Sequence, residues 1–380
     1  MNIRQWTLAT MAELETRAPD WRDADLILVF AAVEYFSDPD WVARLLASAP
    51  DATWAGCSTA GEIAGSRVSD HACVLTALRF EQPGSGVKLA TTRLADMADS
   101  QAAGARLGAA LPPEGLRAVL LLGTGVAING SALVLGVESR VAPGVQISGG
   151  LAADGGAFRQ TWTVSADGAA SDQLLALGCY GPQLVLENSS FGGWEAFGPA
   201  RKITRCHENI LYELDGERAL DIYKRYLGDY ASQLPASGLL FPFDMLGPNQ
   251  NGSGIIRTIL GVNEEEGSLL LAGDIDPDGY LRLMHSSTDK LIQGAASAAQ
   301  AVAPALAAPG QTLALLVSCI GRKLVMGDRV EEEVEAVMDT LGPSVVGTGF
   351  YSNGEISEAA ARTECRLYNQ TMTITLVGER

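Results

Sequence analysis

The chain has 380 residues and a mass of 39.9 kDa, enough for two domains or for one large α/β unit. Hydrophobic residues make up 47% and charged residues 19%, a composition typical of a globular protein and not of a disordered chain. The formal net charge of −18 argues against nucleic acid and anionic membrane surfaces as partners, because it repels phosphate groups.

Histidine and cysteine are too sparse for common metal centres. The chain has three histidines and six cysteines with no CxxC pair, so a zinc site is not expected. Its first 21 residues lack a long apolar core, and no stretch of about 18 apolar residues occurs. We therefore expect a reduced, cytoplasmic protein with no membrane insertion.

A strand and a helix open the first round of elements. Residues 25–32 (DLILVFAA) predict a buried strand, and residues 38–46 predict a helix with Asp38 as cap and Pro39 at its first position. The Gly-rich segment 53–65 follows. Two further strands (72–80 and 87–93) and an Ala-rich helix (99–111) complete this round.

The same order recurs twice more along the chain. A strand, a helix and a Gly-rich strand are predicted at 116–122, 131–141 and 145–156, and again at 313–318, 328–341 and 344–356, with a last strand at 366–377. We predict an α/β to α+β fold of quasi-repeated β-α-β units with mixed sheets, its N-terminal and C-terminal parts packed around a cleft.

Glycine spacing supports the repeat. Two glycines stand five residues apart in each Gly-rich segment: Gly56 and Gly61, Gly150 and Gly155, Gly349 and Gly354. The first and third segments also share a glutamate, Glu62 and Glu355. Glycines at fixed positions of a strand indicate tight turns or a close approach of backbone.

The pattern changes between residues 200 and 227. A strand-like stretch precedes a helix in which Leu220, Tyr223 and Leu227 share one face, so we place a domain boundary here and divide the chain into 1–198 and 199–380. Beyond it we predict a loop at 242–254, a hairpin around 263–267, a strand at 279–285 and a helix at 288–302 capped by Thr288.

Six strings in chain order resemble the FIST family of bacterial sensory proteins, and together they cover most of the chain. They are GCSTAGEI (56–63), YELDGERALDIYKRYLG (212–228), RTILGVNEEEGSLLLAGDI (257–275), VSCIGRKLVMG (317–327), GFYSNGEIS (349–357) and NQTMTITL (369–376). The resemblance implies a FIST N-like and a FIST C-like domain that sense a small molecule. It also implies a histidine kinase or a cyclic-di-GMP enzyme as partner, and it leaves a homodimer open.

Stand-alone chains of this length are similar to the haem-containing, nitric-oxide-sensing branch of that family. This implies haem b, whose iron needs one axial ligand over an apolar pocket. The candidates are His207, His285, Cys206 and His71; each histidine is equally consistent with an ordinary solvent-facing residue. The family often has a histidine just before NQTMT, where this chain has Tyr368.

A haem-free sensor of a small metabolite such as an amino acid is the alternative. Its ligand would bind to the Gly-rich turns and to an arginine fork, Arg257 or Arg322. The same groups are equally consistent with tight turns and internal salt bridges. The turn residues concerned are Gly56, Ser58, Thr59, Gly61, Glu62, Tyr351, Ser352, Asn353 and Glu355.

A hydrolase with Cys57 or Ser58 as nucleophile is the third hypothesis. It needs a positioned base, and no histidine stands near either residue in the sequence. We therefore expect a sensor without catalytic activity.

Overall fold

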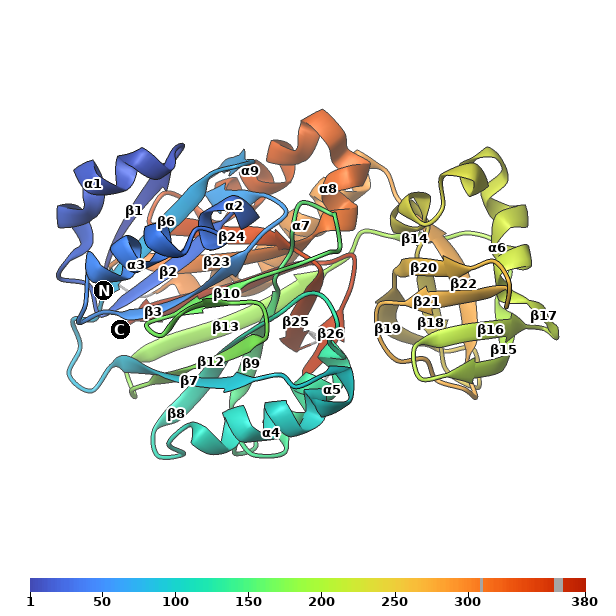
Figure 1. Ribbon diagram of the computed structural model, residues 1–380, viewed down its shortest axis with the longest axis horizontal. Helices are drawn as coiled ribbons and strands as arrows, with labels where there is room; N and C mark the ends of the chain where they lie inside the picture. Colours follow the sequence, from blue (N-terminus) through green and yellow to red (C-terminus); the bar gives the residue numbers. More distant parts are fainter. Residues whose placement is uncertain (308–309, 359–364) are drawn as a thin grey trace.

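A large body and a smaller lobe make up the molecule (Figure 1). The structure is a computed structural model that describes residues 1–307, 310–358 and 365–380. Three six-stranded sheets form the body, and the lobe contains a nine-stranded sheet, as far as the described residues go. None of the helices in these residues is both long and apolar enough to span a membrane.

Each sheet of the body has two parallel strands at its centre. The central pairs are β2 (Leu26–Ala31) with β3 (Thr53–Ser58), β8 (Leu116–Gly123) with β9 (Gln146–Leu151), and β23 (Thr312–Cys319) with β24 (Val345–Ser352). A parallel pair needs a crossover, which is helical in every case. The crossovers are α2 (Val33–Phe36) with α3 (Pro39–Ala47), α5 (Gly130–Glu138), and α8 (Ile320–Met326) with α9 (Val330–Leu341).

Two antiparallel strands extend each sheet on one side. Next to the central pair lie β6 (Cys73–Arg79), β12 (Gln173–Tyr180) and β27 (Met372–Glu379), and outside them β1 (Asn2–Leu8), β7 (Gly86–Arg93) and β13 (Leu184–Phe191). These elements define three units, which we call unit A (2–79), unit B (86–180) and unit C (184–379). A helix follows the outer strand of each: α1 (Leu14–Arg17), α4 (Ser100–Ala110) and α7 (Thr288–Val302).

Each unit completes the sheet of another unit with a hairpin. Hairpin β4 (Glu62–Ala64) and β5 (Arg67–Ser69) of unit A pairs with β24 of unit C. The two equivalent hairpins are β10 (Thr163–Ser165) with β11 (Gly168–Ala170), which pairs with β3, and β25 (Gly354–Glu358) with β26 (Cys365–Tyr368), which pairs with β9. The exchange runs from A to C, C to B and B to A, so it closes the three units into one body.

A glycine is required at one position of each Gly-rich strand. A Cβ atom would lie 1.9 Å from the Val29 carbonyl oxygen at Gly56, 2.0 Å from that of Leu121 at Gly149, and 1.8 Å from that of Leu316 at Gly349. The registers place these three glycines opposite equivalent residues. Gly149, and not Gly150 as the spacing predicted, is therefore the counterpart of Gly56 and Gly349.

The lobe is inserted into unit C between β13 and α7. Its helix α6 (Ala219–Leu227) buries the predicted face of Leu220, Tyr223 and Leu227 against the sheet. The strands are β14 (Glu195–Ala196), β15 (Arg201–His207), β16 (Ile210–Leu214), β17 (Glu217–Arg218), β18 (Phe243–Leu246), β19 (Gly252–Arg257), β20 (Ile259–Asn263), β21 (Ser268–Leu271) and β22 (Tyr280–His285).

The predicted fold class is confirmed: the described chain is a mixed α/β protein of quasi-repeated units. Three local predictions were wrong. Residues 242–254 form most of a hairpin, the segment 366–377 is two strands separated by residues 369–371, and Ser287, not Thr288, caps α7. The division into 1–198 and 199–380 stays a prediction; that point lies between β14 and β15.

Candidate functional site

Three equivalent notches follow from the hairpin exchange. Each lies where the segment after the first central strand of one unit meets the hairpin region of another. The polar notch, about 730 Å³, lies between Lys323 of unit C and Glu62 of unit A. The aromatic notch, about 580 Å³, lies between Phe36 and Trp162. The covered notch, about 250 Å³, lies between Ile128 and Asn353 and is also lined by the lobe.

Glu62 is the buried acid of the polar notch. It begins β4, immediately after the Gly-rich strand, and is only 1% exposed. Its carboxylate accepts hydrogen bonds from the Thr59 hydroxyl and, at 3.1 Å, from the Ala72 amide. Burial nevertheless raises the pKa of Glu62 to about 7, because these donors only partly replace water. Near neutral pH this carboxyl can therefore gain or lose a proton.

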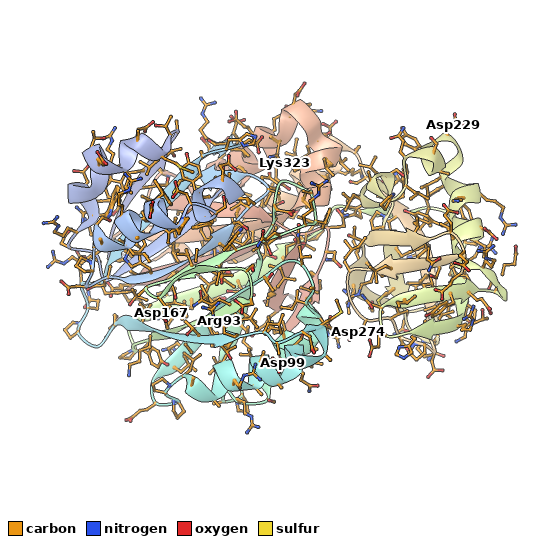
Figure 2. All side chains as sticks on the ribbon, in the orientation of Figure 1. Arg93, Asp99, Asp167, Asp229, Asp274 and Lys323 are labelled. Atoms are coloured by element: carbon orange, nitrogen blue, oxygen red, sulfur yellow. The ribbon has the colours of Figure 1, made fainter. Side chains whose placement is uncertain are left out.

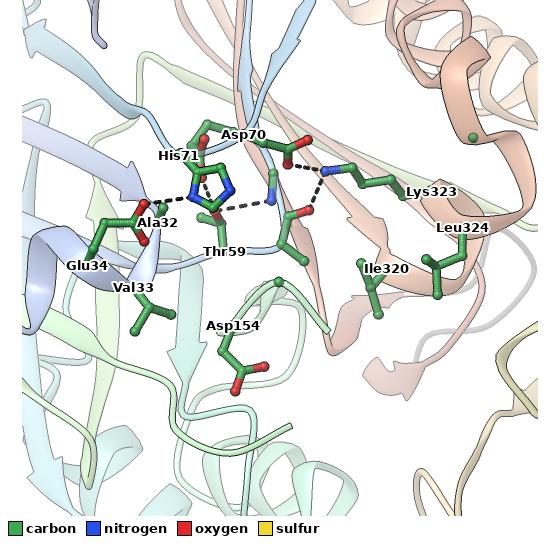
Figure 3. A pocket seen from close by; sticks show the side chains of 15 residues that line it. Ala32, Val33, Glu34, Thr59, Asp70, His71, Asp154, Ile320, Lys323 and Leu324 are labelled. Atoms are coloured by element: carbon green, nitrogen blue, oxygen red, sulfur yellow. Dashed lines mark hydrogen bonds and ion pairs between the residues drawn. The ribbon is translucent and has the colours of Figure 1, made fainter. Parts of the chain in front are cut away.

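Lys323 enters the same notch from α8 (Figure 3). Its ammonium donates to the Ala60 carbonyl oxygen at 2.8 Å and forms an ion pair with Asp70. The Nζ atom also lies 5.6 Å from the centre of the Tyr351 ring. A Cβ at Gly61 would lie 2.6 Å from Nζ, so the glycine leaves room for the lysine.

His71 and Glu34 form an exposed part of the rim. Their side chains are 2.8 Å apart, and this hydrogen bond raises the pKa of His71. Asp154 also lines the notch, but its carboxylate accepts from the amides of Phe158, Arg159 and Gln160 and thereby fixes its own loop. The notch thus combines four carboxyl groups with one lysine and one histidine, which favours a ligand that carries a positive charge.

Glu355 is the counterpart of Glu62 in unit C. Its carboxylate accepts from the Ser352 hydroxyl at 2.6 Å and from the Thr371 amide at 3.1 Å. The side chain is fully buried, and burial raises its pKa to about 8. Ser352 and Tyr351 are also buried, and the Tyr351 hydroxyl donates to Glu333. Of the predicted ligand residues in unit C, only Asn353 lines one of the three notches.

The two predicted arginine forks lie outside the polar notch. Arg322 is buried in an ion pair with Glu333, as its salt-bridge alternative implied. Arg257, in the lobe, donates to the carbonyl oxygens of Asp274 at 3.1 Å and Leu367 at 3.2 Å. Burial lowers the pKa of Arg257 to about 10.

The four candidate axial ligands do not fit a haem site. His207 and His285 are exposed at the ends of β15 and β22, and the His285 ring packs edge-on against Phe197. Cys206 is half-buried, and burial raises the pKa of its thiol. Only His71 lines one of the notches, and there it belongs to a charged rim. Within the described residues no group of three His, Cys, Asp or Glu side chains could hold a metal ion.

Both candidate nucleophiles of the hydrolase hypothesis are buried and engaged in packing or hydrogen bonds. Cys57 is buried, and burial raises the pKa of its thiol well above the usual value. The Ser58 hydroxyl donates to the Ala153 carbonyl oxygen at 2.7 Å and accepts from the Trp162 amide at 2.9 Å, so it holds units A and B together.

The structure brings Thr59, Gly61 and Glu62 together with residues that sequence reasoning missed. Lys323 follows the candidate Arg322, and Asp70 precedes the candidate His71, but neither was singled out. The sequence did carry a signal for the lysine, since Lys323 and Arg322 are the two charged residues in the otherwise apolar string CIGRKLVM. Its partner Asp70, 253 positions away, carries no such signal.

Two family models match most of the chain. The model of the FIST N domain matches residues 25–217, and the model of the FIST C domain matches residues 219–358. No curated protein matches the chain in sequence. Among solved structures, a cyanuric acid hydrolase from A. caulinodans is similar over 100% of this chain and 98% of its own, with 9% identity and a TM-score of 0.36.

Proposed function

Because the chain belongs to the FIST family of sensory and signalling domains, we propose that it senses a small amine-bearing metabolite, such as an amino acid, in the polar notch. The observation that carries this proposal is Glu62, a buried carboxyl with a pKa near 7 in the wall of an open cavity of about 730 Å³. A buried acid beside an open cavity is typical of a ligand site.

The ligand chemistry follows from the charges of the notch. An ammonium group would form a charge-assisted hydrogen bond with Glu62 and would favour its deprotonated form. The same group would compete with Lys323 for Asp70, and the released lysine could then pair with a carboxylate of the ligand. An α-amino acid carries both groups on the same carbon atom.

Helix α8 contacts both the polar notch and the connections of the lobe. Lys323 contacts the notch, whereas Arg322, its neighbour, donates to the carbonyl oxygens of Gly192 and Leu291. Gly192 follows β13, where the chain enters the lobe, and Leu291 lies in α7, just after the chain leaves it. Displacement of Lys323 would therefore act on both connections of the lobe.

The partner is proposed from the family alone. A histidine kinase or a cyclic-di-GMP enzyme would respond to the changed position of the lobe, and a homodimer is compatible with this arrangement. The cytoplasm is the compartment we propose.

Haem-based nitric oxide sensing stays a prediction from the family resemblance. A Soret band in protein expressed with haem supplied, lost on replacement of His207, His285 or Cys206, would favour it over amine sensing. We expect no stoichiometric haem, because none of these three side chains lines one of the three notches and the fourth candidate, His71, is paired with Glu34 on a charged rim.

A ligand screen tests the amine proposal. The twenty L-amino acids and putrescine are assayed for thermal stabilisation, and each hit by calorimetry, in the wild type, in Glu62→Gln and in the matched surface variant Glu114→Gln. We expect at least one compound to bind and to lose about tenfold or more in affinity in Glu62→Gln alone. Binding that is equal in all three proteins, or no hit, would contradict the proposal.

A further inference from the structure

The covered notch lies between the body and the lobe. The body lines it with the segment after β8, with Leu151 at the end of β9, and with Asn353, just before β25, and Leu367 of β26 in unit C. The lobe contributes Asn209, Leu260 and the end of β21. Asp274, close to this end, marks the margin of the lobe that faces the body in Figure 2. Any molecule in the notch would touch both parts of the protein.

The lining is mainly apolar, and part of it is uncovered. Ile128, Leu151 and Leu367 line it from the body. On the lobe side, Leu260 and Leu270 remain 36% and 40% exposed. Large aliphatic side chains exposed on neighbouring strands cost free energy that a bound apolar molecule would recover.

Asn353, a lining residue, has one polar atom without a hydrogen-bond partner among the described residues. The Asn353 amide nitrogen donates to the Gly125 carbonyl oxygen at 3.2 Å, which fixes the orientation of the carboxamide. Its Oδ1 atom is buried and accepts no hydrogen bond from the described residues. The other two asparagines are engaged: Asn209 donates to Leu271 at 2.9 Å, and Asn129 bridges Asp274 and the Ala132 amide. A buried acceptor without a donor is costly, so a donor is the group this wall lacks.

The covered notch lies at a position equivalent to that of the polar notch, because both result from the exchange of hairpins. In each, the segment after the first central strand of one unit (β23 or β8) meets the hairpin of the next unit (β4 with β5, or β25 with β26). The charged groups of the polar notch, Glu62 and Lys323, have no counterpart in the lining of the covered notch. The polar notch therefore suits a charged ligand, and the covered notch suits an uncharged, apolar one.

We propose that the covered notch is a second ligand site, which takes a small uncharged apolar molecule with one N–H or O–H donor for the Asn353 oxygen. At the packing density of protein interiors, its volume suits about ten non-hydrogen atoms. Because the ligand would contact both lobe and body, its binding also favours the position of the lobe seen here. This site is independent of the amine site.

Calorimetry with indole and indene tests the proposal. The two molecules have the same size and shape, but only indole has an N–H donor. We expect the wild type to bind indole about tenfold more tightly than indene, and Asn353→Leu to remove this preference. Ala272→Leu, which adds a larger side chain to the lining, should abolish the binding of both. The matched variant Ala166→Leu in the aromatic notch should change neither.

Equal affinities of the wild type for indole and indene would overturn the donor requirement. Indole binding that persists in Ala272→Leu but disappears in Ala166→Leu would place it in the aromatic notch and overturn the site. If Asn353→Leu does not fold, the indole-to-indene ratio in the wild type and the two alanine variants still decide the proposal.

Discussion

Glu62 and Glu355 are held in the same way in two units of the body. Each accepts a hydrogen bond from the hydroxyl three residues before it and from the amide that precedes the last strand of its unit. Unit B has Gly155 at this position, as the register with Gly149 shows. Glu62 lies beside the open polar notch and Glu355 is fully buried, so the same arrangement borders a cavity in one unit and is packed in the interior in the other.

Glu355→Gln should make the stability of the protein less dependent on pH. Burial raises the pKa of Glu355 from 4.5 to about 8, so the folded state binds a proton that the unfolded state has lost. Stability therefore falls as pH rises from about 5 to 8, by about 4 kcal/mol at most from this residue. Urea unfolding at pH 5 and pH 8 measures this fall. We expect a smaller fall in Glu355→Gln; an equal fall in both proteins would contradict the assignment.

The affinity for an amine should rise with pH through the titration of Glu62. An ammonium group binds the carboxylate and not the protonated acid, and the pKa of Glu62 is about 7. Below that value affinity should drop by up to about tenfold for each unit of pH. Calorimetry at pH 6 and pH 8 with the tightest amino acid from the screen measures this dependence, and Glu62→Gln should abolish it. The same slope in Glu62→Gln would assign the titration to another group, such as His71.

The order of strands and helices could be predicted from the sequence because it depends on local patterns. Asp38 accepts from the amides of Asp40 and Trp41 as the cap of α3, and the apolar face of α6 is buried, as predicted. Even the threefold repeat was visible in the glycines. The equivalence of Gly149 was not visible, since the five-residue spacing to Gly155 favours Gly150 and only the register with Leu121 shows that Gly149 is the counterpart.

The exchange of hairpins and the polar notch could not be predicted in this way. The pairing of Glu62 with Phe350 joins residues far apart in the chain. The sequence of a short strand such as β4 does not indicate which strand it pairs with. The ion pair of Asp70 with Lys323 depends on that exchange. Sequence reasoning therefore found Glu62 but assigned arginines to it that lie elsewhere.

Alanine at Gly149 or Gly349 should destabilise the body strongly. The new Cβ would lie 2.0 Å or less from a backbone carbonyl oxygen of the neighbouring parallel strand, which cannot move without breaking the sheet. We expect a loss of about 3 kcal/mol or more. Gly144→Ala, in a turn with open space around the added Cβ, should cost only about 1 kcal/mol because φ is 89° there. Urea unfolding compares the three variants, and similar costs would contradict the close approach.

Replacement of Lys323 by Met should shift the lobe even without ligand. The variant loses the ion pair with Asp70 and the hydrogen bond to Ala60, and so frees the helix whose Arg322 holds both connections of the lobe. The distance between spin labels at Asp167 of the body and Asp229 of the lobe, both labelled in Figure 2, is measured in a Cys206→Ser background. We expect a shifted or broadened distribution.

Two further variants separate this coupling from a general loss of stability. Lys88→Met, in the outer strand of unit B, removes a lysine remote from α8 and should leave the distribution unchanged. Arg322→Lys should alter the distance distribution, because the hydrogen bonds to Gly192 and Leu291 are lost. Adding Lys323→Met to this variant should then change the distribution no further. If Arg322→Lys alters the distance and Lys323→Met does not, the polar notch and the lobe are uncoupled, and amine binding would need another route to the partner.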